Sequence, residues 1–439
     1  MITNLTRLVA LISCLLLAGC STARLMMPTP NLYVNSKTDL YTSLAKELKV
    51  NEVELLYLTD RLAEQDEAGE LRFGYGRSHS MSFGTALVDL GVDMSWDELL
   101  QASRSQKRSK PVKMEMGKIT ELVRGAQSPL PYALVDGEII EDPTLLQQRN
   151  RAIEVVRRTL VQRLSQTPRK EVFIYIHGFH NTFDDAAYAM AEFWHFLGRI
   201  GVPLIYTWPA GRPGLSGYSY DRESSEFTVY HLRETLGMIA GIPEVEKIHV
   251  IAHSRGTDVA VTALRELTLK TRAAGVDPRS KFKIHNFVLA APDLDVMVAE
   301  QRIDGDKLTL STHRLTVYTS PDDRAIGIAG RLFRSPEGRI GAYSKEDLTD
   351  YQRRMARFYD GSDFAIIQYP GASKAYRSRG DSFGHSYFRN APAVSSDLML
   401  MLRDDIDPGT PGRPLERVDQ SFYMIPPGYP EGIQETDTN

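Results

Sequence analysis

The sequence predicts an α/β fold in which a mostly parallel sheet is covered by helices on both faces. From about residue 171 onward, short β-branched runs alternate with segments that have helical periodicity. The β-branched runs are apolar throughout, as expected for strands buried on both faces. Strands that alternate with helices need crossover connections and therefore lie parallel. The composition, 42% hydrophobic and 25% charged, is that of an ordinary globular protein.

Eight strands are predicted, six of them in this alternating region. The six are expected at residues 172–176, 203–208, 248–252, 287–291, 315–319 and 364–369. The helices of the same region are expected at residues 186–197, 224–240, 257–267 and 394–402. Two earlier strands, 53–59 and 82–90, are separated by a polar, glycine-bearing stretch and predict an antiparallel hairpin. Residues 144–165 have helical periodicity.

Residues 101–120 are rich in Lys, Arg and Ser, which predicts an exposed loop. A solvated surface is the first interpretation of this stretch, and a contact with anionic lipid head groups is the alternative.

The N-terminus has the features of a targeting segment. Arg7 supplies a positive charge ahead of an apolar run over residues 8–17, which is too short to span a bilayer comfortably. The run ends in Leu17-Ala18-Gly19-Cys20, which resembles a bacterial lipoprotein signal. The resemblance implies cleavage before Cys20 and acylation of that residue, and Ser21 after it favours the outer membrane, facing the periplasm. An uncleaved signal anchor or a secreted protein is the alternative.

Composition and motifs argue against several other structural and functional classes of protein. Cys14 and Cys20 are the only cysteines, so the mature chain has neither an intramolecular disulfide nor a cysteine nucleophile. A net charge of −4 gives no electrostatic reason to expect nucleic-acid binding. Gly74 and Gly76 form an incomplete glycine motif without a following helix, so no nucleotide cofactor is expected.

Ser254 is the sharpest chemical signal in the sequence. It stands in Ala252-His253-Ser254-Arg255-Gly256, between a predicted buried strand and a predicted helix. A nucleophilic serine on a tight strand-to-helix turn needs small neighbours, and the helix N-terminus directs amide groups toward it. The alternative is a serine that only caps the helix.

A second motif, His177-Gly178-Phe179, follows another predicted buried strand. Such a segment supplies an oxyanion-hole amide, so we expect the backbone N–H groups of Phe179 and Arg255 to face the reacting oxygen. His177 and His180 lack the acidic residue and helical spacing of a zinc motif, so no metal site is expected.

With these two motifs the chain resembles the α/β-hydrolase superfamily, and more specifically a bacterial family of unknown function described as esterase/lipase-like. The resemblance covers roughly residues 52–400. Its other motifs are residues 57–61, 82–84, 207–209, 218–224, 291–295 and 384–388. The departures are Arg255, where many such enzymes have Met, and the arginine-rich stretch 324–358.

The resemblance implies a mostly parallel eight-stranded sheet, antiparallel N-terminal strands and an insertion after strand seven. It also implies the chain order Ser, acid, His for a catalytic triad. His385 follows the last strand and is preferred, since His285 and His313 precede strands. For the acid, Asp323 is preferred.

Asp293 and Asp322 remain alternatives for the acid. Trp208, His177 and Tyr220 are candidate substrate-binding residues, with a core or loop-fixing role as the alternative for Trp208 and Tyr220.

The sequence therefore predicts a membrane-anchored serine hydrolase that cleaves a carboxylic ester and needs no cofactor. An amidase, a peptidase, an acyltransferase or a non-enzymatic binding protein on the same fold are the alternatives. The expected division of the chain is signal peptide 1–19, tether 20–50, N-terminal strands and loops 51–170, catalytic core 171–405 and C-terminal tail 406–439.

Overall fold

The computed structural model describes residues 24–34, 40–41, 44–214, 217–372 and 383–431. The expected signal peptide and the predicted lipidation site Cys20 lie outside these residues. None of the helices within these ranges is both long and apolar enough to cross a membrane.

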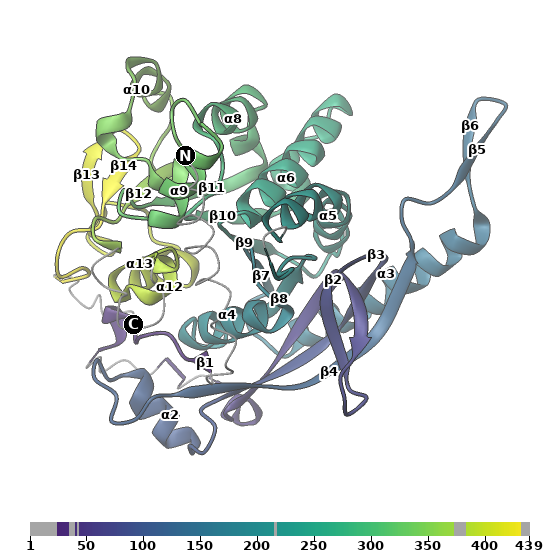
Figure 1. Ribbon diagram of the computed structural model, residues 1–439, viewed down its shortest axis with the longest axis horizontal. Coiled ribbons are helices and arrows are strands. Elements are labelled where there is room, and N and C mark those ends of the chain that lie inside the picture. The colour runs from purple at the N-terminus through teal and green to yellow at the C-terminus, as the bar shows by residue number, and fades with distance from the viewer. Residues whose placement is uncertain (1–23, 35–39, 42–43, 215–216, 373–382, 432–439) are drawn as a thin grey trace, which may run out of the picture.

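One large sheet forms the centre of the described part of the chain (Figure 1). Eight neighbouring strands in it run parallel, in the order β2, β8, β7, β9, β10, β11, β12, β14. Their bounds are β2 (Glu52–Gln65), β7 (Glu171–Ile176), β8 (Val202–Thr207), β9 (Lys247–His253), β10 (Ile284–Ala290), β11 (Thr312–Thr319), β12 (Phe364–Gln368) and β14 (Phe422–Met424). Antiparallel strands extend both edges: β3 (Leu71–Leu90), β4 (Lys113–Gln127) and β1 (Arg24–Leu25) beyond β2, and β13 (Glu416–Asp419) beyond β14. The predicted α/β fold with antiparallel N-terminal strands is confirmed.

Helices cover both faces of the sheet because successive side chains of each strand point to opposite sides. In β7, Val172 and Ile174 join one apolar core, and Phe173 and Tyr175 join the other. The first core is closed by α3 (Pro143–Ser165), α5 (Gly217–Ala240) and α6 (Gly256–Ala273). The second is closed by α4 (Phe183–Phe196) and α13 (Pro392–Leu402).

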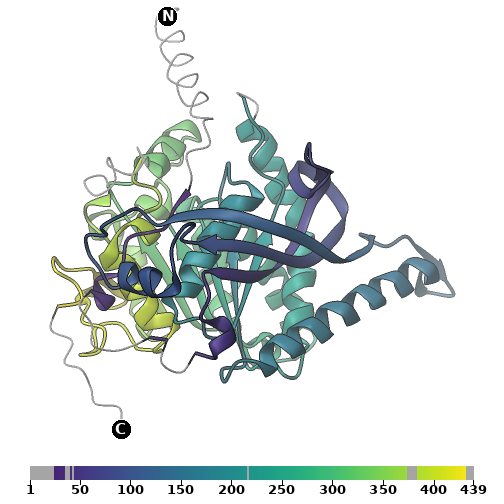
Figure 2. The ribbon, with the colours of Figure 1, turned by 90° about the horizontal axis from the view of Figure 1, so that it is seen from below.

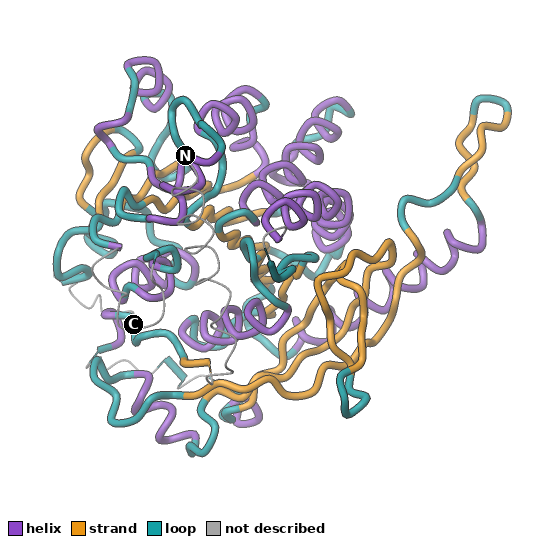
Figure 3. Tube along the Cα trace, in the orientation of Figure 1, coloured by secondary structure: helices purple, strands orange, loops and turns teal. Residues whose placement is uncertain are grey.

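Short helices occupy the connections between strands (Figure 3). The α-helices are α2 (Trp96–Ser103), α7 (Pro278–Phe282), α8 (Val296–Glu300), α9 (Arg324–Leu332), α10 (Asp350–Ala356) and α12 (Tyr387–Asn390). The single-turn elements are η1 (Asn31–Tyr33), η2 (Lys46–Leu48), η3 (Gln301–Gly305), η4 (Leu308–Ser311), η5 (Ile340–Ala342) and η6 (Lys345–Asp347). The expected insertion after the strand at 315–319 is present and contains α9 and α10.

The structure differs from the sequence-based expectation at residues 101–120. The second half of this stretch belongs to β4, a 15-residue strand that lies between β3 and β1. Met114 and Ile119 are buried in the core although the adjacent Lys113, Glu115 and Lys118 are charged. The exposed loop is thus limited to the short connection between α2 and β4.

The expected tether and tail are also built into the fold where they are described. β1 pairs with β4, and Met26 and Met27 are 1% exposed. At the other end of the chain, Arg413 is fully buried and donates two hydrogen bonds to Asp397, at 2.7 and 2.8 Å. Both segments therefore contribute to the core of the domain.

Candidate active site

Ser254 lies in the tight turn that joins β9 to α6. Its φ angle of 53° is in the left-handed region, which a non-glycine residue adopts only under local strain. The turn is held in place because the Ser254 N–H donates to the carbonyl of Ala290 at 3.0 Å. The Ser254 carbonyl in turn accepts hydrogen bonds from the N–H and the hydroxyl of Thr257. This is the strand–turn–helix context that the motif requires.

Two glycines allow the close approach of the chain around Ser254. A Cβ at Gly178 would lie 2.6 Å from the Ser254 Cβ, and a Cβ at Gly256 would lie 2.2 Å from the carbonyl oxygen of His177. Both separations are far below van der Waals contact. The backbone of the loop after β7 thus packs closely against the turn that carries Ser254.

The predicted oxyanion amides belong to these two segments. Neither the Phe179 N–H nor the Arg255 N–H donates a hydrogen bond to another group of the described ranges. The loop carrying Phe179 is fixed by Asp221, which accepts hydrogen bonds from the N–H of His180 at 2.9 Å and from that of Gly211 at 3.1 Å. Burial, as the largest cause, raises the pKa of Asp221.

Asp323 and His385 meet beyond the ends of β11 and β12. His385 Nδ1 lies 2.7 Å from the second carboxylate oxygen of Asp323, whose side chain has no exposed surface. The first oxygen of Asp323 accepts the Ile326 N–H and caps α9. A backbone hydrogen bond from the Arg324 N–H to the carbonyl of Phe383, at 3.1 Å, fixes the segment that carries His385.

The His385 segment also contacts the serine turn. The rings of His253 and His385 are 4.7 Å apart, and Nε2 of His253 lies 3.4 Å from the His385 carbonyl oxygen. Burial, followed by the charge of His385, lowers the pKa of His253 well below its usual value. His253 is therefore neutral, and its ring packs against the rings of His385 and Phe388.

The other candidates for the acid and the base have different partners. Asp293 forms a buried ion pair with Arg339 at 2.8 Å. His285 pairs with Asp405 at 2.7 Å and stacks on His313, beside the N-terminal ends of β10 and β11. The structure thus brings neither histidine to the edge of the sheet where Ser254 lies. Asp322 is half-buried beside Asp323.

His177 and Trp208 lie behind the site, and neither has exposed surface. Their rings stack at 5.1 Å, Nε2 of His177 accepts the Trp208 backbone N–H at 3.0 Å, and the Trp208 indole N–H donates to the His177 carbonyl at 2.8 Å. Burial and nearby Arg61 lower the pKa of His177 well below its usual value. These contacts support the core role rather than the substrate-binding role expected for these two residues. The core role was the stated alternative for Trp208.

Tyr220 is partly exposed and tied to β3. Its hydroxyl donates to the carbonyl of Tyr75 at 2.9 Å, and the guanidinium groups of Arg77 and Arg212 lie 4.7 and 5.0 Å from its ring centre. These contacts fit the loop-fixing alternative, and a contact between Tyr220 and substrate stays a prediction.

Two further residues support the site, and both belong to motifs of the resemblance, residues 57–61 and 218–224. Arg61 is buried, and its guanidinium donates to the carbonyls of Ala210 at 2.8 Å and Asn181 at 2.7 Å. Burial lowers the pKa of Arg61 to about 10. Tyr218 packs on Phe179 at 4.9 Å between ring centres, and burial raises its pKa to about 12. Arginine is mostly exposed in proteins and tyrosine is intermediate, so residue type alone gives little signal for the supporting roles of Arg61 in β2 and Tyr218 in α5.

No group of three or more His, Cys, Asp or Glu side chains suited to a metal ion occurs within the described ranges. A search of curated proteins finds no match. A family model described as an alpha/beta hydrolase of unknown function (DUF900) matches residues 154–403, more than half of the chain. The match includes Ser254, Asp323 and His385. The chain belongs to this family of α/β-hydrolases.

Proposed function

We propose that this hydrolase cleaves a carboxylic ester through an acyl-enzyme on Ser254, with His385 as general base and Asp323 as its orienting acid. The observation that carries the proposal is the 2.7 Å contact between Asp323 and His385, on a segment that packs against the strained Ser254 turn. A carboxylate on Nδ1 leaves Nε2 of the histidine to accept a proton. The buried Asp323 side chain supports this role, because little water competes for its oxygen.

The reaction would proceed in two halves. Ser254 Oγ attacks the ester carbonyl while His385 takes its proton, and the amides of Phe179 and Arg255 donate to the oxygen that becomes negative. The tetrahedral intermediate collapses, the alcohol leaves with the proton from His385, and the acyl group stays on Ser254. Water, deprotonated by His385, then releases the carboxylic acid and restores the serine.

Ester hydrolysis is proposed in preference to amide hydrolysis and to transfer of the acyl group to an acceptor other than water. All three reactions share the acyl-enzyme, so the substrate series must decide between them. The full chain would be tested against p-nitrophenyl esters of graded chain length, with matched anilides in parallel. Hydrolysis of the esters alone agrees with the proposal, and hydrolysis of anilides at comparable rates contradicts it.

The nucleophile is tested with a fluorophosphonate probe and peptide mass spectrometry. We expect the probe on Ser254, and Ser254→Ala to lose esterase activity by on the order of 10⁴- to 10⁶-fold. Ser165→Ala is the matched control, because Ser165 is an exposed serine at the end of α3. Folded protein that fails to react, or Ser254→Ala with full activity, would refute the assignment.

Acylation of Cys20 and attachment to the outer membrane, facing the periplasm, are part of the proposal. Their support is the sequence Leu17-Ala18-Gly19-Cys20. Several acyl chains give stable anchoring, since each buried methylene contributes about 0.8 kcal/mol. Intact-mass measurement of the protein extracted from membranes tests this, with Cys20→Ser as the unlipidated comparison.

A further inference from the structure

An isolated hairpin projects from the body of the protein. It consists of β5 (Tyr132–Val135) and β6 (Glu138–Glu141), joined by Asp136 and Gly137. Figures 1 and 3 show it standing apart, at the end of the segment between β4 and α3. In the described part of the chain, β5 and β6 pair only with each other.

The hairpin exposes apolar side chains on both faces. The strand register places Tyr132, Leu134 and Ile139 on one face, and Val135 and Ile140 on the other. These five side chains are between 52% and 69% exposed. A two-stranded hairpin is only marginally stable in water, and clustered apolar exposure of this kind marks a surface that binds something.

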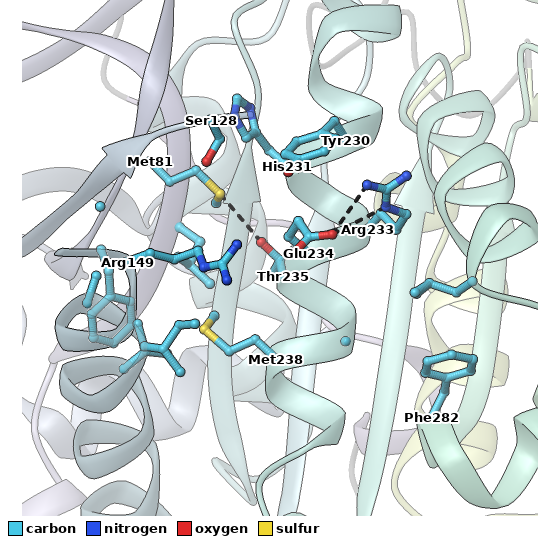
Figure 4. A pocket seen from close by; sticks show the side chains of 18 of the residues that line it. Met81, Ser128, Arg149, Tyr230, His231, Arg233, Glu234, Thr235, Met238 and Phe282 are labelled. Carbon is cyan, nitrogen blue, oxygen red and sulfur yellow. Dashed lines mark hydrogen bonds and ion pairs between the residues drawn. The ribbon is translucent and has the colours of Figure 1, made fainter. Parts of the chain in front are cut away.

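A groove with a mostly apolar lining, which would suit the apolar side chains of the hairpin, opens near the base of the hairpin (Figure 4). Its volume is about 510 Å³, and its lining comes from β2, β3, β4, α3, α5, the C-terminal half of α6 and α7. Most of the lining is apolar, including Phe83, Val156, Met238 and Phe282. A cavity of this size takes several aliphatic side chains.

The two surfaces carry opposite charge. Between Ser128 and Gln148 the chain has no Lys, Arg or His, and the tip of the hairpin bears Asp136 and Glu138. Neither acid forms an ion pair within the described ranges, whereas Glu141 pairs with Arg149 of its own chain. At the groove, Lys270 and Lys281 are exposed and likewise form no ion pair with described residues.

We propose that the hairpin of one copy of this chain docks in the groove of a second copy, and the reverse, to form a twofold dimer. α3 links the two surfaces. Its first residue, Pro143, follows the end of the hairpin by two positions, and Arg149, Ala152 and Ile153 in its next turns line the groove. Figure 2 shows α3 running outward toward the hairpin. A reciprocal exchange, in which each copy donates its hairpin and receives that of the other, is isologous and closes as a twofold dimer.

The acidic tip favours this occupant over a lipid bilayer. A hairpin that enters a membrane tip-first would bring Asp136 and Glu138 into contact with lipid, which is costly for charged groups and repelled by anionic head groups. In the groove of a second copy the same carboxylates would face Lys270 and Lys281.

The first test is the oligomeric state of the full chain in a non-ionic detergent, measured by sedimentation velocity across a concentration series. We expect a dimer at micromolar concentration. Leu134→Ser/Ile139→Ser should weaken it by about a hundredfold or more, since each dimer loses four buried aliphatic side chains. Both side chains are exposed in the single copy, so folding of the variant is unaffected. A monomeric wild type, or a variant that dimerises like wild type, would overturn the proposal.

The second test exchanges the charges. Glu138→Lys alone and Lys270→Glu/Lys281→Glu alone should each weaken the dimer, and all three changes together should restore it. Lys46→Glu/Lys107→Glu is the control, because both lysines are exposed and neither lines the groove. Failure of the combined variant to recover would overturn the charge pairing and with it the docking site.

A vesicle experiment distinguishes the membrane as occupant. Cys20→Ser protein, which cannot be acylated there, is floated with vesicles of phosphatidylcholine and phosphatidylglycerol. We expect no difference in flotation between this protein and its Leu134→Ser/Ile139→Ser form. Flotation that depends on these two side chains would overturn the dimer proposal in favour of lipid.

Discussion

Replacing Gly178 by alanine tests whether the loop after β7 positions the serine turn. The added methyl group would lie 2.6 Å from the Ser254 Cβ and 3.1 Å from Nδ1 of His253, whereas carbon atoms in contact sit about 3.5 to 4.0 Å apart. The serine turn or the loop must therefore move by about 1 Å. Both neighbours are buried and fixed by backbone hydrogen bonds, so overpacking should cost about 1 to 3 kcal/mol of folding free energy.

A displacement of that size acts on catalysis more than on folding, because 1 Å of misplacement can cost about a hundredfold in rate. We therefore predict that Gly178→Ala folds but reacts with a fluorophosphonate about a hundredfold more slowly. The assay is stopped-time labelling of Ser254 at a temperature well below the unfolding midpoint. Gly330→Ala in α9 is the matched control, since its nearest heavy atom would be 4.0 Å away. Labelling of Gly178→Ala at the wild-type rate would refute the argument.

Three further changes have defined outcomes. Asp323→Asn should lower esterase kcat by about 10⁴-fold, because the amide favours the wrong tautomer of the histidine, while Asp293→Asn keeps most of the activity; equal losses would contradict the preference for Asp323. In the folded state the pKa of His253 lies well below its value of about 6.5 in the unfolded chain, so the ring stays neutral. The free energy of unfolding therefore has its full contribution from His253 above pH 6.5 and decreases as the pH drops below 6.5. Urea unfolding at pH 7.5, 6.5 and 5.5 should show this loss. His253→Gln should reduce the slope of the unfolding free energy against pH by up to about 1.4 kcal/mol per pH unit, and an unchanged slope would oppose the argument. Asp397→Ala should cost about 3 to 5 kcal/mol in the same assay because it leaves Arg413 buried without its partner, and a loss under 1 kcal/mol would contradict that role.

The central part of the fold could be predicted because the burial of each strand is visible in its own short stretch of sequence. Strands buried on both faces are continuous apolar runs, and each lies next to an amphipathic helix, so β7 to β12 were located to within a few residues. β4 was missed because Lys113 and Glu115 alternate with the buried Met114, and the charged side chains dominated the interpretation of the stretch.

The sheet edges could not be predicted for a different reason. The C-terminal segment is held by Arg413, whose partner Asp397 belongs to a helix of the core. Sequence alone does not indicate that two charged residues are buried together. At the site, chain order, position after a strand and the family resemblance favoured Asp323 over Asp293 and Asp322. The contact of Asp323 with His385 and the ion pair of Asp293 with Arg339 agree with that preference.

The pairing of β1 with β4 has a consequence for where this hydrolase would find its substrate. The described part of the chain starts at Arg24 in β1, four residues after Cys20, and four extended residues reach at most about 14 Å. If Cys20 is acylated as proposed, the body of the enzyme would rest almost directly on the lipid surface, with little freedom to diffuse into the surrounding compartment. Esters that are themselves held in or near that surface would then meet the enzyme far more often than freely soluble ones.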